Sequence, residues 1–174
     1  MPWKMVREVD VFFAAATEAD AAAIAELRAA VAHALTRLHG KGHWSSSGTE
    51  KGALRAIRTS RVILARTGAE IVGTLSLGTR KPWAIALEYF TPVRQPLYLH
   101  DMAVAPVAQG HGIGRGLLVE AERVARAWPA DAIRLDAYDG PVGAGAFYAR
   151  YGFRDMGRVA YKGTPLIYFE LPLG

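Results

Sequence analysis

The sequence contains no cysteine, which excludes disulfide bonds, thiolate metal ligands and a cysteine nucleophile. It also lacks any apolar run near the roughly 20 residues that a membrane-spanning helix needs. The alanine-rich segment 14–25 carries Glu18 and Asp20 and has neither a basic leader nor a cleavage site, so it is not typical of a signal peptide. We therefore expect a cytoplasmic protein with no membrane segment.

Acidic residues are fewer than basic ones, and the net charge is +5. This excess favours an anionic partner, although solubility alone accounts for such a charge equally well. The basic residues are scattered, and no RNA-recognition motif, zinc finger or basic helix accompanies them, so we expect a small anionic ligand and no nucleic acid. With 174 residues, 51% of them hydrophobic, the chain fits one domain over residues 1–174.

Hydrophobic periodicity divides the chain into strands and helices. The expected strands are 9–14, 61–66, 70–79, 97–104, 132–138, 159–161 and 166–171. A first helix follows the N-cap Thr17, and further helices are expected at 49–59, 113–128 and 145–151. The apolar stripe of the first helix, which we expect to face a core, consists of Ile24, Leu27, Val31, Leu35 and Leu38. The order β-α-α-β-β-β-α-β-α-β-β predicts a mixed α+β sheet flanked by helices.

Glycines concentrate where strand 97–104 passes into helix 113–128. Gly110, Gly112 and Gly114 remove side chains at this turn. The first amides of a helix lack internal partners and lie at the positive end of its dipole, so the turn is a candidate pyrophosphate site. Gln109 and Arg115 could add hydrogen bonds or charge at its rim.

Two common nucleotide motifs do not fit this turn. A Walker loop needs Gly-Lys followed by Ser or Thr, which the sequence lacks. A dinucleotide fingerprint needs glycine at its sixth position, where Arg115 or Leu117 stands, depending on the starting glycine. A flexible loop that merely ends a strand is the remaining structural alternative.

Gln109, Gly112 and Gly114 satisfy the pattern Gln/Arg-x-x-Gly-x-Gly, and here the chain resembles the GNAT acetyltransferase superfamily. Segment 146–153, Ala-Phe-Tyr-Ala-Arg-Tyr-Gly-Phe, is similar to the family's C-terminal motif. The resemblance implies a mostly antiparallel sheet splayed between strands 4 and 5. It also implies acetyl-CoA as co-substrate, no metal, and direct transfer to the primary amine of a small molecule or peptide. In one departure, residues 139–143 read Asp-Gly-Pro-Val-Gly where many relatives carry an asparagine.

The resemblance also implies the residues of the site. The expected coenzyme contacts are Met102, Ala103, Val104, Gln109, Gly110, His111, Gly112, Ile113, Gly114, Arg115 and Phe147. Of these, Met102, Ala103 and Val104 should offer backbone groups to the pantetheine arm. Tyr148 is expected to protonate the departing thiolate, and the structural alternative is a core tyrosine with a satisfied hydroxyl.

An amine must lose a proton before it attacks, and the resemblance implies His100 as the base. Imidazole titrates near neutrality and suits this role. Side chains alternate along a strand, so His100 and Asp101 can share one cleft only if a bulge intervenes. Asp101 as base, ordered water as base, a structural His100, and an ion pair of Asp101 with Arg134 all remain open.

The acceptor itself is not specified by the sequence. Segments 39–52 and 80–96 are expected to form its site, and their aromatics (Trp44, Trp83, Tyr89, Phe90) either favour a ring-bearing amine or cover the sheet edge. His39, His43 and His111 have no carboxylate cluster beside them, so we expect no metal site. A non-catalytic coenzyme-A-binding regulatory or partner-binding domain is the alternative function. The chain could form a homodimer.

Overall fold

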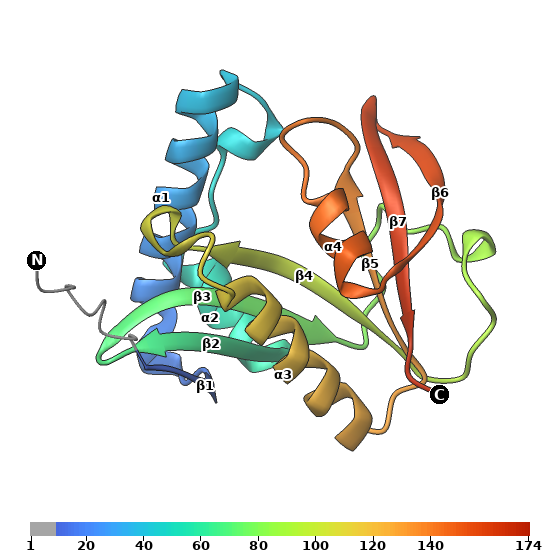
Figure 1. Cartoon of the computed structure of the whole chain (residues 1–174), viewed down its shortest axis with the longest axis horizontal. Coiled ribbons are helices and arrows are strands. Elements are labelled where there is room, and N and C mark those ends of the chain that lie inside the picture. The colour runs from blue at the N-terminus through green and yellow to red at the C-terminus, as the bar shows by residue number, and fades with distance from the viewer. Residues whose placement is uncertain (1–9) are drawn as a thin grey trace, which may run out of the picture.

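In the computed structural model, which describes residues 10–174, a single mixed sheet carries helices on both faces (Figure 1). Its strands are β1 (Val11–Ala15), β2 (Arg61–Thr67), β3 (Glu70–Gly78), β4 (Pro96–Val104), β5 (Ala132–Tyr138), β6 (Arg154–Tyr161) and β7 (Thr164–Pro172). The helices are α1 (Ala21–His39), α2 (Glu50–Thr59), α3 (Ile113–Ala127) and α4 (Gly145–Tyr151). The expected α+β class and the expected order of elements are confirmed.

The sheet order is β1-β2-β3-β4-β5-β7-β6, and every neighbouring pair is antiparallel except β4 and β5. The parallel pair is short, because only 96–98 of β4 pairs with 132–134 of β5. Beyond these residues the two strands separate, which confirms the splay between strands 4 and 5. The separation leaves backbone groups of both strands without a ladder partner.

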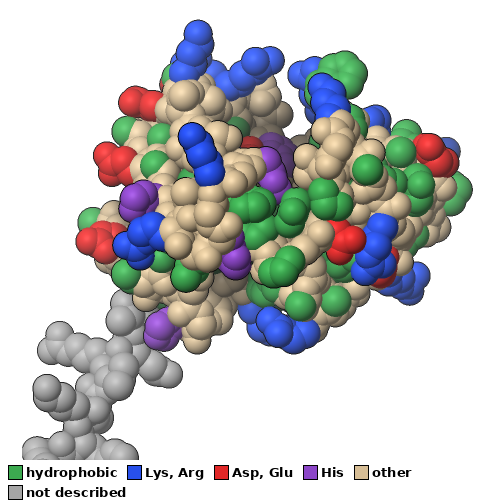
Figure 2. All heavy atoms as spheres, turned by 90° about the horizontal axis from the view of Figure 1, so that it is seen from above, with side chains coloured by type: hydrophobic (Ala, Val, Ile, Leu, Met, Phe, Trp, Pro, Cys, Tyr) green, Lys and Arg blue, Asp and Glu red, His purple; other side chains and the backbone are tan. Residues whose placement is uncertain are grey.

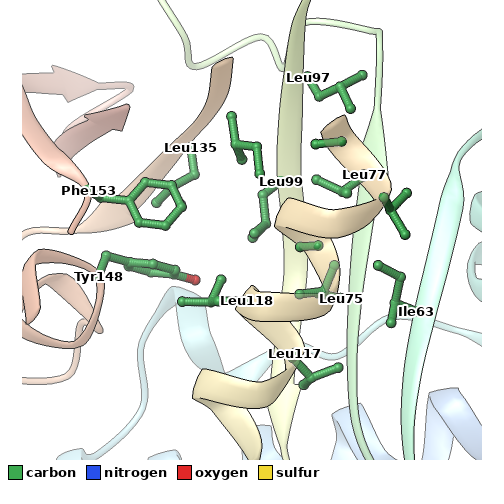
Figure 3. Packing of buried hydrophobic residues seen from close by; sticks show 14 of the residues in the cluster. Ile63, Leu75, Leu77, Leu97, Leu99, Leu117, Leu118, Leu135, Tyr148 and Phe153 are labelled. Carbon is green, nitrogen blue, oxygen red and sulfur yellow. The ribbon is translucent and has the colours of Figure 1, made fainter. Parts of the chain in front are cut away.

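The main core lies between α3 and one face of the sheet (Figure 3). Leu117 and Leu118 of α3 are fully buried and pack with Leu75 and Leu99 of the sheet. Tyr148 of α4 belongs to the same cluster, so α3 and α4 cover one face together. This core fixes α3 against β4, where the glycine turn begins.

The opposite face is covered by α1, α2 and the segment between β3 and β4. Ile24 of α1 and Ala53 of α2 pack on Leu64 of β2. Farther along the sheet, Ile85 and Phe90 form a separate cluster with Tyr98 and Tyr168. On this face, the helices α1 and α2 and the segment between β3 and β4 leave a space over β4 and β5.

The apolar stripe of α1 is only partly a core stripe. Ile24 and Leu27 are buried as expected, but Leu38 is exposed, so its predicted burial is wrong. The reason is geometric: the last turns of α1 project beyond the sheet (Figure 1). Val31 and Leu35 line a cavity instead of the core.

Several element ends differ from expectation. Val9, the expected start of β1, lies outside the described residues, and Thr17 precedes a short 3-10 turn (Glu18–Asp20) before α1 begins at Ala21. β6 begins at Arg154, earlier than the expected 159, because it is an edge strand with exposed polar residues and a register shift near Gly157. Among residues 10–174, no helix is both long and apolar enough to cross a bilayer.

A buried ion pair lies under the segment between β3 and β4. Arg134 Nε lies 2.9 Å from Glu170 Oε2, and both side chains are almost fully buried. The guanidinium also donates to the carbonyl of Thr91 and lies 5.0 Å from the ring centre of Phe90. These contacts hold residues 90–91 against β5 and β7. The ion pair therefore positions the segment between β3 and β4 that covers this face of the sheet.

Candidate active site

The start of α3 is open to a ligand. Gly112 is its N-cap residue with φ 79°, Gly110 has the same φ, and no side chain caps the helix. A Cβ at either glycine would meet no neighbour within 4 Å, so conformation rather than crowding favours glycine here. The helix start therefore remains a candidate anion site, because its first amides and the positive end of the helix dipole favour a negative charge.

Two polar side chains expected at this site bond to the protein instead. Gln109 Nε2 donates to the carbonyl of Val104 over 3.1 Å. His111 Nδ1 lies 3.2 Å from the carbonyl of Ala108. These side chains therefore hold the turn on the end of β4, and backbone amides are the groups left for a ligand.

Gly114 and Arg115 connect the turn to α4. A Cβ on Gly114 would lie 3.1 Å from Phe147 Cζ and 3.6 Å from Met102 Cε, so this glycine allows close packing. The Arg115 guanidinium lies 5.4 Å from the ring centre of Tyr151. Phe147, expected at the coenzyme site, thus lies directly beside the start of α3.

A cavity of about 390 Å³ opens where β4 and β5 separate. Its walls come from 99–103 of β4, 135–138 of β5, Tyr148 of α4, Arg28 of α1 and side chains between residues 43 and 47. Viewed from above, the surface is hollowed between two lobes, with histidine side chains beside the hollow (Figure 2). The cavity brings together His100, Met102, Ala103 and Tyr148 of the expected site.

A bulge in β4 brings His100 and Asp101 onto the same side. Ser76 pairs with His100 and Thr74 with Ala103, so two residues of β4 stand against Leu75 alone. Asp101 lies at the bulge, and its φ of 54° accommodates the extra residue in β4. His100 Nδ1 then lies 3.0 Å from Asp101 Oδ2, so the bulge required for a shared cleft is present.

Asp101 is bonded through both carboxylate oxygens. Its Oδ1 accepts from Arg28 Nη2 over 2.9 Å, so the alternative that Asp101 pairs with an arginine holds, but the arginine is Arg28, since Arg134 bonds Glu170. The hydrogen bond with His100 and the charge of Arg28 outweigh burial and lower the pKa of Asp101. An ionised carboxylate only accepts, so His100 donates from Nδ1, and in the neutral imidazole the lone pair is then on Nε2. A Cβ on Gly78 would lie 3.8 Å from that atom, in ordinary van der Waals contact, so Nε2 lies close to β3.

Tyr148 belongs to the core and also lines the cavity. Its ring is buried against Phe147, Phe153 and Phe169, with ring centres 5.3–5.9 Å away, and Figure 3 shows it beside Phe153 with the hydroxyl turned toward Leu118. The hydroxyl donates to Met102 Sδ at 3.5 Å. Burial, aided by the charge of Asp136, raises the pKa of Tyr148, so the group stays protonated at neutral pH.

Sequence reasoning missed Asp136, a half-buried carboxylate in the cavity wall. Burial raises the pKa of Asp136 despite the opposing charge of His100. A signal was present, since alternation along strand 132–138 places Arg134, Asp136 and Tyr138 on one face of a largely apolar strand. Arg28 was missed as well, because no local pattern links it to β4.

Aromatic side chains of the two expected acceptor segments are separated in space. His43 and Trp44 line the cavity and pack on Tyr138, with ring centres 4.7 Å and 5.6 Å from it. Trp83 and Tyr89 line a different groove, beside β6 and β7. None of residues 80–96 lines the cavity.

Within residues 10–174, no three His, Asp or Glu side chains gather in a way that could hold a metal ion. The groups around the cavity that could take part in chemistry include the imidazole–carboxylate pair, the tyrosine hydroxyl and backbone amides. These groups lie where the parallel strands β4 and β5 separate, and the uncapped start of α3 follows the end of β4.

Over residues 27–153, more than half of the chain, the sequence matches the Acetyltransferase (GNAT) family. The chain belongs to this family. No curated protein sequence matches it significantly.

Solved structures share the fold at low sequence identity. An acetyltransferase from Salmonella typhimurium with its cofactor acetyl-CoA is 20% identical, with a TM-score of 0.69 over 94% of each chain. The PaiA N-acetyltransferase from Thermoplasma acidophilum, in complex with coenzyme A, is 14% identical, with a TM-score of 0.70 over 94% of this chain and 99% of that one. The ribosomal-protein-alanine N-acetyltransferase from Brucella melitensis is 22% identical, with a TM-score of 0.69 over 93% of this chain and 99% of that one.

Proposed function

We propose that this protein transfers the acetyl group of acetyl-CoA to a primary amine by direct transfer in a ternary complex. The observation that carries the proposal is the cavity between β4 and β5, whose walls bring His100 and Tyr148 together. Met102, in the same wall, lies beside Gly114 of the α3 turn. The residues fit the coenzyme, since uncapped amides and positive-φ glycines at 110 and 112 suit a pyrophosphate. Bound acetyl-CoA supplies the activated acetyl group as a thioester.

The amides of β4 that no longer pair with β5 can bind along an extended arm and at the thioester oxygen. Met102, Ala103 and Val104 are the residues in this position. Gly110, His111, Gly112, Ile113, Gly114 and Arg115 provide the backbone of the phosphate turn. Gln109 supports that turn from β4, and Phe147 forms its wall toward α4.

His100 takes the proton of the attacking amine on Nε2, while Asp101 holds Nδ1. The new bond joins the amine nitrogen to the acetyl carbon as the carbon–sulfur bond breaks. Tyr148 donates its proton to the departing sulfur, a role consistent with a hydroxyl that already donates to the sulfur of Met102. No covalent acyl-enzyme is required, in keeping with the lack of cysteine.

The direct test is thiol release from acetyl-CoA with pooled primary amines, combined with calorimetry of coenzyme A binding. We expect thiol release that depends on both protein and amine. Tight coenzyme binding without thiol release across the panel would contradict transfer and favour the non-catalytic alternative.

A further inference from the structure

The cavity contains one carboxylate that no cation of the described chain balances. Asp101 is paired with Arg28 and His100, whereas Asp136 forms no ion pair with any residue in 10–174. Holding an unpaired carboxylate in a half-buried position is unfavourable, as the raised pKa of Asp136 indicates. A cationic ligand would supply the missing counter-charge.

Asp136 lines the same cavity as the two groups proposed to move protons, His100 and Tyr148. A cation bound at Asp136 would therefore lie in the cavity that also contains the proposed proton acceptor and proton donor. An attacking amine must enter this cavity.

An aromatic wall lies beside Asp136, made by His43, Trp44 and Tyr138. Their ring centres are 4.7–5.6 Å apart. Tyr138 shares a strand face with Asp136 and is two residues farther on, roughly 7 Å along β5. Flat aromatic surfaces bind apolar and aromatic bodies and also favour a nearby cation.

The wall is held in place by bonds within the segment after α1. Trp44 Nε1 donates to the carbonyl of Gly40 over 2.9 Å, so the indole has no unmet donor and presents its ring. Thr36 Oγ1 and Ser45 Oγ are hydrogen-bonded over 2.7 Å, which fastens the segment to α1. The wall is therefore preformed, which lowers the entropy cost of binding.

We propose that the acceptor is a protonated primary amine attached, a few bonds away, to an aromatic or broad apolar body. The ammonium binds at Asp136 and the body packs against His43, Trp44 and Tyr138. This inference rests on the proposed transferase function and specifies its substrate class. A polyamine fits less well, because the second carboxylate of the cavity, Asp101, is already paired.

The kinetic test compares 2-phenylethylamine with butylamine and spermidine in the acetyl-CoA assay. We expect kcat/KM for 2-phenylethylamine to be at least about tenfold higher, since an aromatic body buries more surface on the wall. Asp136→Asn should raise its KM about 10- to 100-fold, as expected for a lost charged hydrogen bond. Asp139→Asn is the matched control, because Asp139 pairs with Arg158 and does not line the cavity.

The two tryptophans provide a second matched pair. Trp44→Ala should abolish the preference for 2-phenylethylamine over butylamine. Trp83→Ala should leave it unchanged, since Trp83 is 82% exposed and lies in another groove. The inference would be overturned by equal use of both amines, or by loss of the preference in Trp83→Ala but not in Trp44→Ala.

Calorimetry of 2-phenylethylamine, with coenzyme A present, separates this inference from the proposed function. Binding that Asp136→Asn weakens supports the acceptor class even if no acetyl transfer occurs. Transfer to other amines with no binding of 2-phenylethylamine overturns the acceptor class and leaves the transferase function standing. Absence of both binding and transfer overturns the acceptor class as well.

Discussion

His100 donates from Nδ1 to Oδ2 of Asp101 across 3.0 Å, although the two residues are neighbours on one strand. The bulge in β4 makes this contact possible and fixes which imidazole nitrogen remains free. Asp101 is thus a positioning residue for the proposed base.

The first prediction concerns that positioning. Asp101→Asn can donate its amide to Nδ1, which would place the proton on Nε2 and remove the base. We expect kcat to fall about 100-fold, within the usual contribution of general base catalysis. Steady-state kinetics should show little change in KM for acetyl-CoA. A rise in the KM for acetyl-CoA as large as the fall in kcat would indicate that strand β4 is disturbed. It would contradict the assignment of Asp101 as a positioning residue.

The second prediction concerns acid stability. The pKa of Asp101 is lower in the folded protein than its ordinary 3.8, chiefly because of the His100 hydrogen bond. Its ionised form therefore stabilises the fold fully above that ordinary value, and the contribution is lost as pH falls through the lower, folded-state pKa. Urea unfolding should show wild type more stable than Asp101→Asn at pH 6, with the difference shrinking below pH of about 4. A difference independent of pH would contradict this.

The third prediction tests Tyr148 as the acid. Tyr148→Phe keeps the buried ring and removes the hydroxyl, so kcat should fall about 100-fold while coenzyme A affinity stays nearly constant. Tyr151→Phe is the matched control, since its hydroxyl bonds Glu122 and does not line the cavity. Thiol-release kinetics and calorimetry report the two quantities. Unchanged turnover in Tyr148→Phe would remove it from the mechanism.

The fourth prediction concerns the phosphate turn. Gly112→Trp places a large side chain where the α3 amides are open, and coenzyme A binding measured by calorimetry should be abolished. Gly68→Trp is the matched control, because Gly68 also has positive φ and no neighbour within 4 Å but lies in the β2–β3 turn. Both variants bear a similar backbone strain of about 1–2 kcal/mol. Retained binding in Gly112→Trp would refute the phosphate-turn assignment.

The fifth prediction concerns the buried ion pair. Glu170→Ala leaves Arg134 buried without its carboxylate partner and should lower the free energy of unfolding by about 3–5 kcal/mol. The double variant Arg134→Met with Glu170→Leu should recover much of this loss, since no charge is then left unpaired. Denaturant unfolding measures both. A single variant as stable as wild type would show that the pair is not a source of stability.

The sequence predicts those parts of the site that depend on short segments. The glycine turn and α3 follow from residues adjacent in the chain, as do Tyr148 and the end of α4 at Gly152. The contacts of Asp101 could not be predicted, because they depend on how β4 pairs with β3 and on Arg28, which is 73 residues away. The alternation of strand 132–138 gives the face on which Asp136 lies, but its place in the cavity wall depends on the separation of β4 and β5, which no local pattern encodes.

Helix α1 serves both halves of the proposed site. Arg28 in its middle holds Asp101, and the segment after its end carries Trp44 to the mouth of the cavity. A shift of this helix would move the wall that selects the acceptor and the carboxylate that orients His100 together. Acceptor preference should therefore be transferable between related proteins by replacing only the segment after α1. The turn of α1 that carries Arg28 should be kept.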